Sequence, residues 1–181
     1  MLGMVNQAVE DMARNLGGET LWREIAEGAG LDPDVGILRM ESYPDEVTFA
    51  LVQSASRALK LSQETILEEF GKHWILYTAE NGYGQLLKTA GQDLSTFISN
   101  LNLLHGKVEG LMPSTRCPRF HVQEAGPNSL QLLYQSHREG LSSLVIGLLK
   151  GLGERFQTKV EVRELAKQTN GHLFELTWER P

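Results

Sequence analysis

One stretch of this sequence decides how the rest is organised: Leu94-Ser-Thr-Phe97-Ile98-Ser-Asn-Leu101-Asn-Leu-Leu104-His105-Gly-Lys-Val108. Its apolar residues recur at steps of three and four, which predicts a helix with one apolar face. His105 lies on that apolar face. A buried imidazole needs a partner to offset the cost of its desolvation, so the stretch predicts a helix that carries one candidate ligand.

Further along the chain, the run Tyr134-Gln-Ser136-His-Arg138 alternates a phenol, a hydroxyl and a guanidinium. If a strand continues through this run, side chains at every second position share one face, and Arg138 is long enough to bend back over it. These groups are the donors that a pair of buried carboxylates requires. With His105 upstream as a nitrogen ligand for iron, they predict a haem pocket whose propionates are held by the three donors.

Each half of this pattern also has a simpler explanation. A histidine on an apolar helix face is more often a core residue than a metal ligand. The alternating donors also fit a solvated strand end that precedes a helix. The combination of the two halves, rather than either alone, favours the haem pocket.

The order of the predicted elements indicates an α+β fold. Apolar stripes of helical period fill the first two thirds of the chain, with a break at Gly17-Gly18 and a turn at 81–84, and they predict helices at 47–59, 62–78 and 94–108. Alternating patterns and one apolar run then predict strands at 117–122, 130–134, 156–162 and 172–178, and a helix at 141–152. We expect a helical N-terminal part, then a four-stranded antiparallel sheet with an inserted helix, and haem between the two parts.

Composition limits the class of protein. With 181 residues, 41% of them apolar, the chain is most simply one domain, 1–181. Its formal net charge of −6 argues against a nucleic-acid partner, because affinity for phosphates comes from clustered Lys and Arg. The sequence has no apolar run of roughly 18 residues and no signal-peptide core, so we expect no membrane attachment. The one cysteine, Cys117, excludes an intrachain disulfide and fits a reducing cytoplasm.

The whole chain resembles the haem-nitric oxide/oxygen-binding (H-NOX) family, whose domain is also the haem sensor of soluble guanylate cyclase. The resemblance rests on a Tyr-x-Ser-x-Arg motif, matched by Tyr134, Ser136 and Arg138, downstream of a helical His105. It implies that His105 is the proximal ligand to the iron of haem b (iron protoporphyrin IX) and that the motif grips the propionates. It also implies that Pro118 presses the porphyrin out of plane.

The same resemblance implies an apolar surrounding for the porphyrin. Leu101 and Leu104 share the apolar face of the proximal helix, while Met4, Val5 and Leu144 are expected to line the distal side. Two further segments are similar to the family: Met1-x-Gly3-x-Val5-Asn6 and residues 151–160.

The distal residues decide which gas is held. Dioxygen is retained better when an O–H or N–H points at its outer atom, whereas nitric oxide binds ferrous iron without that help. In oxygen-storing members a tyrosine on the helix after the motif supplies this donor, and Ser143 is the corresponding residue here. Trp74 offers an indole N–H, although a tryptophan at helical spacing is more often a core residue. We therefore expect nitric oxide and carbon monoxide as ligands and leave dioxygen open.

The resemblance also implies how a signal arises. Nitric oxide weakens the bond trans to itself, so the link between iron and His105 should lengthen or break, the helix shift and the porphyrin flatten against Pro118. We expect a separate output partner, a histidine kinase or a cyclic-di-GMP enzyme, since 181 residues leave no room for an output domain.

Two other classes of protein stay open. A haem enzyme such as a peroxidase needs a polar distal acid–base pair, and only Trp74 offers a conspicuous polar tip there. A non-haem interaction or small-molecule-binding module would keep His105 as a core residue. Cys117 is expected to be inert, and His73, His121, His137 and His172 show no metal-ligand spacing.

Overall fold

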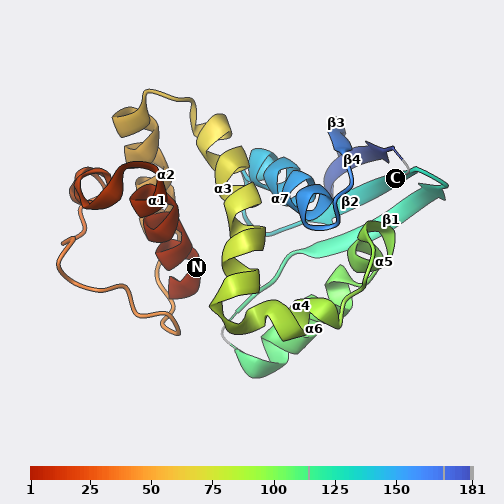
Figure 1. Cartoon of the computed structure of the whole chain (residues 1–181), viewed down its shortest axis with the longest axis horizontal. Helices are drawn as coiled ribbons and strands as arrows, with labels where there is room; N and C mark the ends of the chain where they lie inside the picture. Colours follow the sequence, from red (N-terminus) through yellow and green to blue (C-terminus); the bar gives the residue numbers. More distant parts are fainter. Residues whose placement is uncertain (114, 169, 180–181) are drawn as a thin grey trace.

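All helices except one precede the strands in the described part of the chain (Figure 1). The structure, a computed structural model, describes residues 1–113, 115–168 and 170–179. The helices are α1 (Gly3–Gly28), α2 (Asp45–Leu59), α3 (Gln63–Thr78), the π-helical turn η1 (Ala79–Tyr83), α4 (Gly84–Lys88), α5 (Leu94–Ser99), α6 (Leu101–Leu111) and α7 (Ser142–Arg155). The strands are β1 (Arg119–Gly126), β2 (Ser129–Gln135), β3 (Val160–Gln168) and β4 (Gly171–Trp178). The predicted α+β class is confirmed.

The strands form one antiparallel sheet in the order β1-β2-β4-β3. Along β2 the buried side chains of Leu130, Leu132 and Tyr134 alternate with less buried ones, except at Leu133. Alternate residues of a strand share a face, so this row supplies one wall of the interior. Figure 1 shows α7 lying across the sheet, between it and α3.

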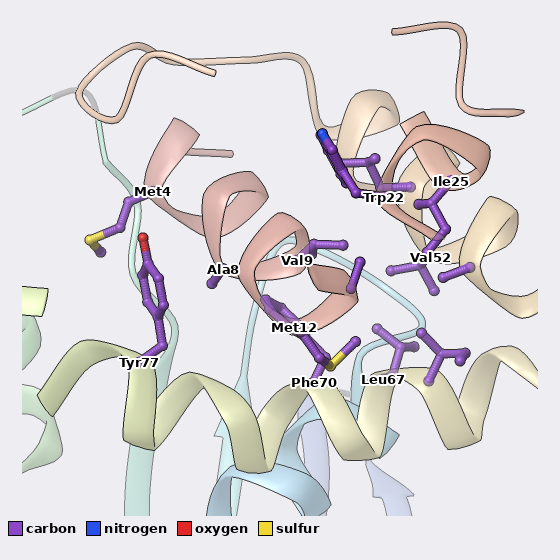
Figure 2. Close-up of a cluster of buried hydrophobic side chains, with 14 of the residues drawn as sticks. Met4, Ala8, Val9, Met12, Trp22, Ile25, Val52, Leu67, Phe70 and Tyr77 are labelled. Atoms are coloured by element: carbon purple, nitrogen blue, oxygen red, sulfur yellow. The ribbon is translucent and has the colours of Figure 1, made fainter. Parts of the chain in front are cut away.

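The N-terminal helix bends where the two glycines are. Gly18 has φ 66 and ψ −160, a left-handed conformation that is cheap only for glycine, and this confirms the predicted break. With this bend, α1 packs against both α2 and α3. Figure 2 shows the resulting apolar cluster, drawn from all three helices: Met4, Ala8, Val9, Met12, Trp22, Ile25, Val52, Leu67, Phe70 and Tyr77.

Helices α3 and α7 touch through their backbones. A Cβ atom added at Gly147 would lie 1.9 Å from the carbonyl oxygen of Glu68, and one added at Gly71 would lie 2.4 Å from that of Leu144. Only glycine leaves room for so close a crossing. Trp74 lies on α3 and Leu144 lies on α7. The crossing therefore holds together the two helices that carry these residues.

Two local predictions were wrong. The single helix expected at 94–108 is divided into α5 and α6 at Asn100, which has non-helical φ −97 and ψ 5 and whose side-chain amide donates to the carbonyl of Ala90 at 2.8 Å. Such a side-chain bond competes with the helical ladder. The turn expected at 81–84 is instead the π-helical η1, which joins α3 directly to α4, and the side-chain amide of Asn81 donates to the carbonyl of Tyr77 at 3.0 Å.

The start of one strand also differs from the predicted start. The strand expected from 156 begins at Val160, because α7 continues to Arg155 and Gln157 then takes a left-handed φ of 52. No helix in the described residues is long and apolar enough to cross a membrane.

Candidate functional site

A cavity of about 400 Å³ lies between the helices and the sheet. This volume is in the range of small-molecule sites. The residues that the sequence singled out all line it: Met4, Val5, Trp74, Leu101, Leu104, His105, Pro118, Tyr134, Ser136, Arg138 and Leu144. Residues far apart in the chain are therefore brought to one place.

Two walls of this cavity are built mainly from different apolar clusters, and Trp74 packs against both clusters. We call the first the His105 wall; it consists of Leu101, Leu104, His105 and Pro118. We call the second the helical wall; it consists of Met4, Val5, Trp74, Tyr83 and Leu144, all of which lie in or pack against the cluster of Figure 2.

His105 is held in one orientation by the residue that precedes β1. Its Nδ1 lies 2.9 Å from the carbonyl oxygen of Pro118, which can only accept, so Nδ1 carries the proton. Burial lowers the pKa of His105, although the bond to Pro118 acts in the opposite direction. The side chain is thus a neutral imidazole whose Nε2 is the acceptor, which is the form that binds metals.

The helix of His105 is tied to β1 by further bonds. The side-chain amide of Asn102 donates to the carbonyl of Phe120 at 2.6 Å, and its oxygen accepts from the Phe120 amide at 2.9 Å. The Glu109 carboxylate accepts from the Cys117 amide at 2.9 Å. Helix α6 and the start of β1 therefore form one hydrogen-bonded unit.

The three predicted donors meet at the end of β2. Tyr134 is buried, and burial raises the pKa of its phenol, against the effects of a hydrogen bond with Ser136 and of the charge of Arg138. The strand ends at Gln135, so Ser136 lies just beyond it, where its hydroxyl oxygen accepts from the Arg138 amide at 3.0 Å. The Ser136 hydroxyl therefore lies next to both Tyr134 and Arg138.

Arg138 has a partner that the sequence did not reveal. Its Nε and one terminal nitrogen donate to the Asp45 carboxylate at 2.7 and 3.2 Å, and its other terminal nitrogen donates to the carbonyl of Arg116 at 3.3 Å. The Met1 ammonium also bonds to Asp45, at 2.6 Å. Burial alone would raise the pKa of Asp45, but the bonds from Arg138 and the Met1 ammonium outweigh it and lower that pKa. A guanidinium has five N–H groups, so Arg138 keeps two for a further anion.

The helical wall is mostly apolar, with a few polar tips. Trp74 packs against Phe70 and Tyr77, with ring centroids 6.2 Å away in each case. Its indole N–H makes no hydrogen bond to the described residues. Ser143, the residue that corresponds to the distal tyrosine of oxygen-storing members, does not line the cavity. Tyr83 does line it, and the sequence reading missed this residue because it fell in a predicted turn.

Other reactive side chains form no second centre among the residues that the structure describes. No group of three or more His, Cys, Asp or Glu residues there could hold a metal ion. Burial raises the pKa of Cys117 to about 11, so its thiol is protonated at neutral pH. Ser142 and Glu164 both lie at Nδ1 of His172, at 3.0 and 2.5 Å, whereas a hydrolase triad uses both imidazole nitrogens.

This set of groups fits haem. A neutral imidazole nitrogen suits iron, apolar walls suit the macrocycle, and a phenol, a hydroxyl and a guanidinium suit two carboxylates. The fit rests on groups that converge on one cavity from α6, β2 and the loop before α7.

Comparison with known sequences gives a consistent result. A family model described as Haem-NO-binding (HNOB) matches residues 2–164. Soluble guanylate cyclase gcy-32 of Caenorhabditis elegans is 27% identical over 157 residues, which are 86% of this chain and 23% of that protein. The guanylate cyclase soluble subunit beta-2 of Rattus norvegicus is 32% identical over 93 residues, 51% of this chain and 14% of that protein. The chain thus spans about a quarter or less of these relatives.

Solved structures share the fold. An H-NOX protein from S. oneidensis in the Fe(II)NO ligation state has a TM-score of 0.88 and 21% identity, with 99% of this chain and 100% of that chain covered. An oxygen-binding H-NOX domain related to soluble guanylate cyclases, solved as its oxygen complex, has a TM-score of 0.84 and 19% identity, with 100% and 96% covered. Since the family match extends over most of the sequence, this chain belongs to the Haem-NO-binding (H-NOX) family, a family of haem-based gas sensors related to those of guanylate cyclases.

Proposed function

We propose that this chain holds haem b through His105 and senses nitric oxide and carbon monoxide. The observation that carries the proposal is the convergence in one cavity of the fixed, neutral imidazole of His105 and the donors of Tyr134, Ser136 and Arg138. Haem b is the form that suits the chain, because covalent attachment through a C-x-x-C-H motif needs two cysteines and the sequence has one.

Bound haem would supply an iron atom with an open position for a diatomic gas. Different residues of the chain would hold different parts of the haem. His105 would hold the iron through Nε2, and Tyr134, Ser136 and Arg138 would donate to the propionates. The apolar residues of the cavity would exclude water from the haem, and Pro118 would contact the macrocycle. The apolar residues are Met4, Val5, Leu101, Leu104 and Leu144.

A change in the force on the His105 side chain would be transmitted to α6 and β1. The imidazole bonds to the carbonyl of Pro118, and Asn102 bonds to both backbone groups of Phe120, so α6 and β1 respond together. A ligand shifts an equilibrium by its differential affinity for two states, and this hydrogen-bonded unit is the element that would differ between them.

We propose that the output lies in a separate protein, a histidine kinase or a cyclic-di-GMP enzyme, and that this domain itself catalyses no reaction. One observation supports the division between sensor and output. The matching part of gcy-32 is only 23% of that protein, so a domain of this family occurs there beside other parts of the chain.

The test is a titration of the reduced, haem-loaded protein with nitric oxide and, separately, with carbon monoxide. We expect the Soret band to shift with each gas, and to shift with nitric oxide in the way that marks a weakened or lost axial histidine. A spectrum that neither gas changes would contradict the proposal. Pull-downs and kinase assays, run with and without nitric oxide, test the partner.

A further inference from the structure

Arg116 is a charged residue of the cavity that has no role in the proposed haem site so far. It lies between α6 and β1, lines the cavity and is exposed. Its guanidinium makes no hydrogen bond or ion pair to the residues that the structure describes. By contrast, the Met1 ammonium and the Arg138 guanidinium, which belong to two other lining residues, are both bonded to Asp45.

The backbone of Arg116 is fixed beside the donors at the end of β2. Its carbonyl oxygen accepts from a terminal nitrogen of Arg138 at 3.3 Å. The next two residues are held as well, because the amide of Cys117 and the carbonyl of Pro118 bond to side chains of α6, at 2.9 Å each. These bonds involve only the backbone of the segment, so a change of the Arg116 side chain leaves them in place.

The charge of Arg116 lies at the same end of the cavity. The pKa of His137 is lowered, first by burial and next by the charge of Arg138, and the charge of Arg116 acts in the same direction, against that of Asp45. Charges at the surface of a protein act on one another over a short range in salt solution. The guanidinium of Arg116 therefore lies near His137, the residue between Ser136 and Arg138.

Without Arg116, the charges at this end of the cavity do not balance two carboxylates. The Met1 ammonium and the Arg138 guanidinium carry one positive charge each, and Asp45, which is paired with both, carries one negative charge. One net positive charge remains, whereas the two propionates of a haem carry two negative charges. An anion removed from water is costly unless it is paired, and the guanidinium of Arg116 supplies the second positive charge.

We propose that Arg116 binds one propionate of the haem while Arg138 binds the other, so that the cavity selects a porphyrin with two free carboxylates. This inference rests on the proposed haem site and adds a residue outside the Tyr-x-Ser-x-Arg motif. The side chain of Arg138 is mostly buried, whereas Arg116 is exposed. The contribution of Arg116 is therefore smaller and depends on salt.

The primary test compares Arg116→Gln with Arg119→Gln, each loaded either with haem or with haem dimethyl ester, whose carboxyl groups carry no charge. Arg119 is the matched control because it is the next arginine in the sequence and is exposed, yet it is paired with Glu109 at 2.8 Å and does not line the cavity. Transfer of the porphyrin to an acceptor protein measures its rate of dissociation.

The two porphyrins should give different results. Haem should dissociate about three-fold to five-fold faster from Arg116→Gln than from the wild type, and at the wild-type rate from Arg119→Gln. The dimethyl ester should dissociate at one common rate from all three proteins, because it offers Arg116 no charge to bind.

Salt and a conservative variant provide a second measurement that needs no ester. The difference in haem dissociation between the wild type and Arg116→Gln should shrink as the salt concentration rises from about 0.1 M to about 1 M, because salt screens an exposed ion pair. Arg116→Lys keeps the positive charge and should restore part of the wild-type rate. A merely structural role of Arg116 would show neither the salt dependence nor this rescue.

The outcomes separate this inference from the function on which it rests. A wild-type protein that forms no Soret band with haem would overturn the proposed haem site and the role of Arg116 with it. A wild-type protein with a normal Soret band, together with haem dissociation from Arg116→Gln at the wild-type rate, would overturn the role of Arg116 alone. Faster dissociation of haem and of its dimethyl ester by the same factor would also overturn it, since the lost contact would not be one between charges.

Discussion

The His105 wall and the helical wall of the cavity differ in the partners of their polar groups. On the His105 wall the imidazole is bonded to Pro118, and Asn102 ties the same helix to β1. On the helical wall the Trp74 indole and the Tyr83 phenol have no hydrogen-bond partner among the described residues. A polar group that is already bonded keeps its geometry, whereas a free donor can respond to a ligand. In the proposed function, the wall with bonded groups would hold the cofactor and the wall with free donors would face the bound gas.

Replacing His105 should have the largest effect. In His105→Gly the axial nitrogen and its bond to Pro118 are both lost, so we expect the native Soret band to disappear and free imidazole to restore it, because the deleted side chain leaves room for the small molecule. Absorption spectra with and without imidazole measure this effect.

His121→Ala is the control for that variant, since His121 is an exposed histidine on β1. Its spectrum should match the wild type. An unchanged spectrum in His105→Gly would place the ligand elsewhere and remove the distinction between the two walls.

The helical wall depends on the close crossing of α3 and α7, and a methyl group there should loosen it. Gly147→Ala places a Cβ 1.9 Å from the Glu68 carbonyl oxygen, so we expect a loss of about 2–3 kcal/mol in the free energy of unfolding. Gly106→Ala, in α6 with no atom within 4 Å of the added Cβ, should instead gain about 0.5–1 kcal/mol. Urea denaturation measures both values; equal effects would mean that the crossing is not tight.

Arg138 tests the donors at the end of β2. Arg138→Ala removes a guanidinium that is mostly buried and keeps two free N–H groups, so haem should dissociate about 10-fold to 100-fold faster. Arg138→Lys keeps the charge but not the forked geometry. Its rate of haem dissociation should lie between the rates of the wild type and of Arg138→Ala. Transfer of haem to an acceptor protein measures the rate, and wild-type retention in Arg138→Ala would show that other groups hold the propionates.

Asp45 should give the smallest effect and a pH signature. Its pKa is lowered in the fold, so its carboxylate stabilises the native state above its unfolded pKa, and this contribution disappears as the pH falls through the folded pKa. Asp45→Asn should therefore cost about 1 kcal/mol at pH 7, and the difference from wild type should narrow below about pH 4 and close once the pH has fallen through the lowered pKa of Asp45. Urea titrations at several pH values test this, and a difference that does not narrow as the pH falls below about 4 would be against an ionic role.

The sequence predicted what depends on local periodicity. The α2 and α3 segments, the break at Gly17-Gly18 and the β4 segment all lie where the apolar spacing placed them. The break at Asn100 was missed because the apolar residues before and after it keep the same period. The π-helical η1 was missed because Asn-Gly-Tyr-Gly is also a typical turn sequence.

Contacts between residues far apart in the sequence could not be predicted from local sequence patterns. Asp45 and Arg138 are 93 residues apart, and no spacing rule joins an acid at the start of one helix to a guanidinium after a strand. Tyr83 was overlooked for a related reason, because the contacts that bring it to the cavity include Arg39, which comes from another loop. The predicted site residues, by contrast, were found through a motif and a resemblance, and all of them line the cavity.

The central claim is that the His105 side chain binds the iron of haem in this cavity. The most direct measurement is the absorption spectrum of the purified protein supplied with haem, reduced, and then exposed to nitric oxide. We predict a Soret band typical of haem with one axial histidine, which shifts when the gas is added. A protein that stays colourless after it has been supplied with haem would contradict the claim.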